Sequence, residues 1–208
     1  SFSTGDADGN DWNDLYYLNI EYSYRLLTGI IDDDSKTSYI ALLLGYQEWQ
    51  EDISITSGFQ EICRLPCTSG TGPIAGLNSR YTLNWKNILL GFKGAITIYK
   101  SLSLKGVAIL IPYTEYRGEG IWNLRTDFRQ DPSFEHRANG GYGLQLDASL
   151  IYRISKSFEV DLGYRYWHIK SGVGTDTTYF SSGAVVTTQF NEAVSKREGV
   201  FLGLNYML

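Results

Sequence analysis

The side chains with the most versatile chemistry in this sequence are two cysteines and two histidines. The cysteines belong to the segment Cys63-Arg-Leu-Pro-Cys67, in a stretch rich in Thr, Ser and Gly. A metal site would need further ligands nearby, and none is visible. Two free thiols are one interpretation, but a local disulfide in an exported loop fits the spacing better.

Acidic residues gather in two short polar segments. Asp6, Asp8 and Asp11 lie in a stretch rich in Gly and Asn, and residues 32–34 are consecutive aspartates. Carboxylates in such loops can bind Ca²⁺, but a solvated polar turn is the simpler interpretation. The Gly-rich segment 70–76 lacks the Lys-Ser/Thr pair of a phosphate-binding loop. We therefore predict no metal site and no cofactor.

The elements that position these residues are predicted to be β-strands. Apolar and polar residues alternate along most of the chain, and such alternation is typical of strands with one apolar face. In FEVDLGYRY (158–166) apolar side chains occupy every second position, with Glu, Asp, Gly and Arg between them. The same alternation recurs along the chain. It predicts an all-β protein with seven strands, at about 15–27, 38–55, 79–98, 102–117, 141–154, 158–172 and 197–208.

Two of these strands depart from simple alternation. Apolar residues in 79–98 occupy odd positions up to Trp85 and even positions from Ile88, which predicts a bulge near Lys86-Asn87. The centre of 102–117 reads VAILI and is apolar on both faces, so its register stays open.

The connections between the strands alternate in length. Tight turns at 99–101 and 155–157 alternate with long connections at 56–78, 118–140 and 173–196. This alternation is typical of an antiparallel up-and-down barrel that has its turns at one end and its loops at the other.

The bulk properties favour a membrane barrel over a soluble one. The 208-residue chain has no apolar run long enough for a transmembrane helix, and its net charge of −5 gives no support for nucleic-acid binding. The strands exceed the roughly 9–11 residues that cross a bilayer. A soluble lipocalin-like barrel is the alternative. Aromatic residues near strand ends would form interfacial girdles; they are Tyr16, Tyr17, Trp49, Tyr81, Trp85, Tyr99, Tyr113, Tyr116, Tyr152, Tyr164, Tyr166 and Trp167.

The polar faces of the predicted strands carry charges of both signs. Inside a narrow barrel such charges can pair and fill the lumen, whereas an isolated charge would be costly. A salt-bridged plug is the structural interpretation, and a path for solutes is the alternative. The predicted interior network consists of Glu21, Arg25, Asp147, Arg153, Glu159, Asp161 and Arg165.

The strand number predicts an incomplete barrel. Bacterial barrels have an even number of strands, and seven is odd. We therefore expect a single barrel domain over 1–208, with an odd number of strands missing before Ser1 or one strand supplied by another chain. Its outer loops would lie at about 1–14, 56–78, 118–140 and 173–196.

Several segments resemble those of the omptins, a family of ten-stranded outer-membrane proteases. They are GDADGNDWND (5–14), YLNIEYSYRLL (17–27), LLLGYQEWQEDISITSG (42–58), LLGFKGAITIYKSLSLKGVAILIPYTEY (89–116) and GVFLGLNYML (199–208). GYQE and DW are the clearest points of similarity. The resemblance implies that the chain is the C-terminal part of a ten-stranded barrel, with three strands preceding Ser1.

The resemblance also implies where catalytic residues would lie. Omptins use two acidic residues in the first of these loops and an Asp/His pair in a later loop. Asp11 matches one acidic position, Asp8 is adjacent to the other, and His136 is the candidate base. However, residues 117–125, where the pair is expected, contain neither Asp nor His. Because a general base must lie within hydrogen-bond reach of the water, we predict that the protein is not a protease.

Together these patterns predict an outer-membrane barrel of a Gram-negative bacterium, with its loops facing the cell exterior. The predicted role is structural, surface-binding or complex-anchoring; an omptin-like endopeptidase and a narrow channel for small solutes are alternatives. Outer-membrane lipid is the expected partner, with lipopolysaccharide and other protein subunits as candidates and no nucleic acid. Gly203, Tyr206 and Leu208 in the last strand resemble the C-terminal signal for barrel insertion.

Overall fold

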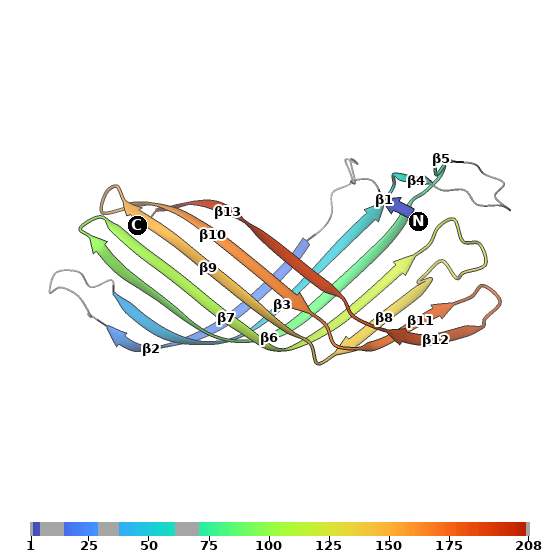
Figure 1. Ribbon diagram of the computed structural model, residues 1–208, viewed down its shortest axis with the longest axis horizontal. Coiled ribbons are helices and arrows are strands. Elements are labelled where there is room, and N and C mark those ends of the chain that lie inside the picture. Colours follow the sequence, from blue (N-terminus) through green and yellow to red (C-terminus); the bar gives the residue numbers. More distant parts are fainter. Residues whose placement is uncertain (1, 5–14, 29–37, 61–70, 207–208) are drawn as a thin grey trace.

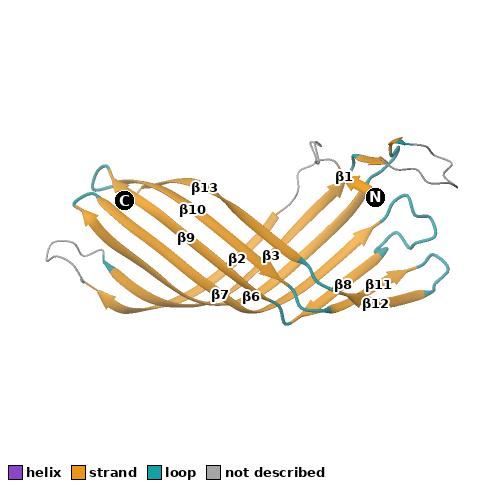
Figure 2. Ribbon diagram, viewed as in Figure 1, coloured by secondary structure: helices purple, strands orange, loops and turns teal. Residues whose placement is uncertain are grey.

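The computed structural model describes residues 2–4, 15–28, 38–60 and 71–206. No described segment is a helix long and apolar enough to cross a membrane. Figure 2 shows that the regular elements are strands. They are β1 (Phe2–Thr4), β2 (Leu15–Thr28), β3 (Tyr39–Ile55), β4 (Gly58–Gln60), β5 (Gly72–Pro73), β6 (Ser79–Tyr99), β7 (Leu102–Ile121), β8 (Phe134–Asn139), β9 (Tyr142–Arg153), β10 (Phe158–Lys170), β11 (Gly174–Tyr179), β12 (Val185–Phe190) and β13 (Val194–Tyr206).

The long strands form an antiparallel meander that curves into a trough (Figure 1). Strand β7 pairs with β9 along Leu102–Ile111 and with β8 along Glu115–Gly120, so β8 and β9 act as one interrupted strand. The interruption includes Gly140, whose φ of 80° suits glycine. Strands β10–β11 and β12–β13 repeat this arrangement. The predicted all-β, up-and-down architecture and all seven predicted strands are confirmed.

The predicted loops are shorter than the sequence indicated. Strand β7 continues to Ile121, so the loop predicted for 118–140 shrinks to 122–133. The loop predicted for 173–196 contains the hairpin β11–β12. Within the described part of 56–78, β4 and β5 pair in a small separate sheet with β1. The sequence pattern fails here because segments such as GTDTTY have no apolar face to reveal them.

The outward face of the trough divides into an apolar part and a polar part. On β6, Ile88 and Leu90 point outward and are exposed, whereas Lys86 on the same face lies directly opposite Glu48 of β3 and Glu115 of β7. The Lys86 Nζ lies 3.8 Å from the Glu48 carboxylate. An apolar belt on the outer surface is typical of a barrel wall in lipid. The belt therefore ends between Lys86 and Ile88, and the strands project beyond it.

The predicted bulge near Lys86-Asn87 is wrong for the pair β3–β6, whose register is unbroken from Tyr39↔Ala95 to Ile55↔Ser79. Odd-numbered residues of β6 face inward throughout. The apolar residues change face because those beyond the lipid belt, such as Trp85, are buried inside. The register does shift against β7 between Ile88 and Leu90, next to Pro112, which has no N–H to donate.

The predicted aromatic girdles are partly wrong. Trp49, Trp85 and Tyr116 are 2%, 2% and 4% exposed, so they are core residues of the inner face. Tyr17, Tyr81 and Trp167 also face inward, whereas Tyr113 and Tyr152 are exposed on the outer face as expected. The sequence could not separate the two groups, because both lie near strand ends.

The two outermost strands of the trough, β2 and β13, do not pair with each other in the described residues. Side chains nevertheless connect the two ends of the sheet across its concave face. Arg197 of β13 forms a salt bridge with Glu51 of β3, and its guanidinium carbon lies 4.3 Å from the Trp49 ring centroid. Tyr17 of β2 stacks on Trp167 of β10 with 6.0 Å between ring centroids. These contacts favour a curled wall over a flat sheet.

Candidate functional site: inner face and outer loops

A buried layer of amides and hydroxyls crosses the inner face at mid-height. Gln47 and Asn87 are fully buried, and the Asn87 Nδ2 donates to the Gln47 Oε1 at 3.0 Å. Thr114 donates to Asn87 at 2.6 Å, Gln145 donates to Gln47 at 3.0 Å, and Gln47 donates to the Tyr17 hydroxyl at 3.0 Å. These bonds link β2, β3, β6, β7 and β9. Each of these side chains has a hydrogen-bond partner, so the network fixes the relative positions of the five strands.

Charged pairs lie on one side of this layer. Arg165 makes two hydrogen bonds to Asp147, at 2.9 and 2.8 Å. Arg153 pairs with Glu159 at 2.9 Å. These four residues, predicted as interior charges, are therefore brought together in pairs.

The remaining predicted interior charges have other surroundings. The Glu21 carboxylate lies 3.9 Å from Lys93, which is not a member of the predicted set. The Arg25 guanidinium lies 5.2 Å from the Tyr39 ring. Asp161 has a buried oxygen without a hydrogen-bond partner among the described residues. Five of the seven predicted charges thus lie in separate pairs, and no continuous network joins them among the described residues.

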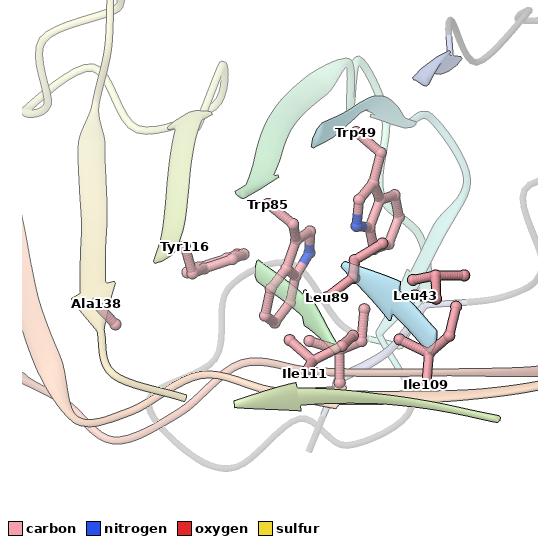
Figure 3. Close-up of a cluster of buried hydrophobic side chains, with 9 residues drawn as sticks. Leu43, Trp49, Trp85, Leu89, Ile109, Ile111, Tyr116 and Ala138 are labelled. Atoms are coloured by element: carbon pink, nitrogen blue, oxygen red, sulfur yellow. The ribbon is translucent and has the colours of Figure 1, made fainter. Parts of the chain in front are cut away.

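Aromatic rings cover the opposite side of the polar layer. Trp49 and Trp85 stack at 6.0 Å, and Tyr116 tilts against Trp85 at 4.6 Å. Figure 3 shows these rings above the aliphatic side chains of Leu43, Leu89, Ile109 and Ile111. This aromatic layer was not predicted, although the odd-numbered apolar run ending at Trp85 was its signal.

His136 lies in a hydrogen-bonded cluster beyond the aromatic layer. Its Nδ1 is 2.9 Å from the Tyr81 hydroxyl, which also bonds the Tyr116 hydroxyl. Its Nε2 is 3.5 Å from the Asp176 carboxylate, and its ring stacks on Phe190 at 4.5 Å. Burial lowers the pKa of His136 below its ordinary value, and the Asp176 carboxylate opposes this effect. The protonated form of the imidazole is thus disfavoured, and most of its side chain is shielded from solvent.

The loops at the end of the strands opposite the tight turns are joined to each other by specific contacts. Asn123 donates to the Gly76 carbonyl at 2.6 Å and accepts from the Asn78 backbone at 2.9 Å. We call residues 74–79, 122–133 and 179–184 the outer module. Within it, Ser181 N donates to the Asp127 carbonyl at 2.9 Å, and Phe128 meets Phe180 edge-on at 5.2 Å.

Other predicted site residues lie outside the described residues or in simple surroundings. Asp8, Asp11, Cys63, Cys67 and Leu208 are not described. Tyr206 is exposed on the outer face of β13, and Gly203 lies opposite Asp161. Among the described residues, no group of three or more His, Cys, Asp or Glu side chains could hold a metal ion.

The sequence matches the family described as Protochlamydia outer membrane protein over residues 14–208. The chain belongs to this family. It is therefore a protein of the bacterial outer membrane, and the apolar belt of its outer surface is the part that contacts lipid. No curated protein matches this outer-membrane protein.

A solved structure with a similar fold is the outer membrane protease OmpT from Escherichia coli. The two structures superpose with a TM-score of 0.70 at 12% sequence identity, over 92% of this chain. The chain spans 63% of the length of that protease. At this identity the likeness concerns the fold alone. The predicted omptin-like barrel architecture of this outer-membrane protein is confirmed.

Proposed function

We propose that this protein is a non-proteolytic outer-membrane barrel that holds the outer module towards the cell exterior as a binding surface. The observation that carries this proposal is the set of contacts that joins the three segments of the module. Loops fixed before binding lose little conformational freedom when a partner docks. Loops on a rigid scaffold are also the usual carriers of binding function.

The exposed side chains of the outer module suit a protein partner. Trp122 and Leu124 are 42% and 46% exposed, and Arg125 lies beside them in a pair with Asp127. Exposed aromatic residues and arginines are enriched in the central parts of interfaces. The polar band around Lys86, between the module and the lipid belt, would lie at the level of lipid headgroups, including those of lipopolysaccharide.

The surroundings of His136 support the absence of protease activity. A general base must reach a water and its substrate. Here the Nδ1 is engaged by Tyr81, the Nε2 faces Asp176, and the ring lies between Phe134 and Phe190. Neither ring nitrogen is directed at open solvent, which favours a packing role for this imidazole.

Peptide cleavage tests the non-proteolytic part of the proposal. Refolded protein is incubated with peptides that contain paired Arg and Lys residues, beside the variant His136→Ala. We expect no cleavage above the buffer rate for either protein. Cleavage by the wild type that disappears in His136→Ala would instead support the omptin-like endopeptidase.

Site-specific crosslinking tests the binding surface. A photoreactive amino acid replaces Trp122 in the outer module, or Lys156 in the turn between β9 and β10 as the matched control. We expect a discrete protein adduct in native membranes from position 122 and none from position 156. If neither position gives an adduct, the barrel has a structural role only.

A narrow channel for small solutes is the second candidate, and the charges of the inner face favour it. Arg165 and Asp147 place charges of both signs on the inner face of the strands. A polar inner face is typical of barrels that conduct water and small solutes. Stepwise conductance in planar bilayers that changes in Arg165→Ala would support this candidate. A folded but silent protein would exclude it.

A further inference from the structure

A cavity of about 230 Å³ lies on the inner face between β2, β6, β7, β9 and β10. Its charged lining residues are Lys93, Lys105, Arg165, Glu21 and Asp147. Three cations against two carboxylates leave one positive charge in the cavity.

Lys105 carries the charge that no carboxylate balances. Arg165 is engaged by Asp147 through two hydrogen bonds, and Lys93 faces Glu21 at 3.9 Å. Lys105 makes no ion pair with any residue in the described part of the chain, and its direct neighbours across the sheet are Ala95 and Ser149. A cation that no carboxylate balances attracts a counter-charge, and the neighbouring Arg165 and Lys93 add to the positive potential at this wall.

The wall of the cavity also offers a neutral donor. The Tyr17 hydroxyl accepts a hydrogen bond from Gln47 at 3.0 Å, so its own proton remains available to donate. The carboxylates, by contrast, are already occupied, since Glu21 accepts from Asn19 at 2.7 Å and Asp147 accepts from Arg165. The Lys105 ammonium and the Tyr17 hydroxyl are therefore donors of this cavity that remain available to a ligand.

We propose that this cavity is a binding site for a small inorganic anion, with Lys105 as its free cation. The anion would face the Lys105 ammonium and take the Tyr17 O–H as a further donor. This anion site is separate from the proposed binding surface of the outer module. It also differs from a channel, because an anion can bind in the cavity without crossing the membrane.

Trp167 lines the same cavity and provides a fluorescent probe. The test measures quenching of folded protein in detergent by iodide, an anion, by caesium, a cation, and by neutral acrylamide. The signal of Trp167 is obtained by difference from the variant Trp167→Phe. We expect iodide to quench this signal far more efficiently than caesium, and inorganic phosphate to compete with iodide.

Substitution of Lys105 decides the assignment. In Lys105→Gln the apparent iodide affinity should fall about tenfold, as expected for the loss of one close ionic contact, while acrylamide quenching stays unchanged. Lys105→Arg should retain iodide binding. The matched control is Lys86→Gln on the outer face, which should behave like the wild type. The neutral Lys105→Met serves in the same test if Lys105→Gln does not fold.

Two outcomes would overturn the proposal. Equal iodide quenching in Lys105→Gln and the wild type would mean that the ammonium holds no anion. A parallel change with acrylamide would mean that the substitution merely alters access to Trp167. Neither outcome affects the crosslinking expected from position 122. The anion site and the binding surface are therefore tested independently.

Discussion

His136 illustrates how one residue joins several elements in this protein. It lies on β8, bonds Tyr81 of β6, faces Asp176 of β11 and stacks on Phe190 of β12. Gly118, its partner on β7, makes the arrangement possible, because a Cβ there would lie 2.0 Å from the Tyr81 hydroxyl oxygen. The histidine thus connects the hairpin β11–β12 to the wall of the trough.

The stability of this region should depend on the protonation of His136. The folded protein has a lowered His136 pKa, so the unfolded state binds the proton more readily. The stabilising contribution is therefore present above the unfolded pKa of about 6.5 and lost as pH falls through the lower, folded value. The titratable groups that face the ring are Tyr81, which also bonds Tyr116, and Asp176.

Amide hydrogen exchange of β8 and β11 measures this effect after correction for intrinsic exchange rates. Protection should decrease in the wild type between about pH 7.5 and about pH 5, and it should be nearly constant in His136→Gln. The matched control is His168→Gln, because His168 lies outside the cluster and should leave the wild-type dependence intact. An unchanged pH dependence in His136→Gln would refute the role of His136.

The sequence could identify His136 as unusual but could not predict its surroundings. Its partner Asp176 is 40 residues away, on a strand without an apolar face to reveal it. The charges at 147 and 165 were easier to predict, since alternation placed both on the inner faces of neighbouring strands. Pairing of Arg165 with Asp147 then follows from the strand register.

At the scale of the elements, lipid contact explains why the strands were predictable. A strand that meets lipid on one side and the lumen on the other must alternate strictly, so β2, β9, β10 and β13 were readable from sequence. The parts of β6 and β7 beyond the lipid follow a different rule. There the outward face is polar and the inward face is aromatic, so the apolar residues move from even to odd positions of β6. This change of face led to the prediction of a bulge, but the pairing of β3 with β6 contains none.

The position of the lipid boundary on β6 can be tested by placing the same charge on either side of it. Leu90→Arg puts a guanidinium within the apolar belt and should lower the free energy of unfolding by about 2–4 kcal/mol. Asn84→Arg lies on the same face beyond Lys86, where Glu48 is within reach, and should cost less than about 1 kcal/mol. Urea titration in lipid vesicles, followed by the gel shift of the folded form, measures both. Equal costs would show that the boundary is misplaced.

At the scale of the whole molecule, the trough has two chemically different ends. The tight turns β6–β7 and β9–β10 lie at one end, and the outer module with β8, β11 and β12 lies at the other (Figure 1). The omptin resemblance predicted this arrangement correctly at the level of the fold, because the fold is shared with OmpT at only 12% identity. It could not predict the chemistry of the loops, since those residues are free to differ on the same scaffold.

Epitope insertion tests the orientation of the whole molecule in the outer membrane. We expect an epitope after Ser182, in the turn between β11 and β12, to bind antibody on intact cells, because the outer module is proposed to face the exterior. An epitope after Lys156, in the turn between β9 and β10, should bind only after permeabilisation. Both turns are exposed and short, so insertion should disturb the sheet equally little. The reverse labelling pattern would place the module on the periplasmic side and remove its proposed role as a cell-surface binding site.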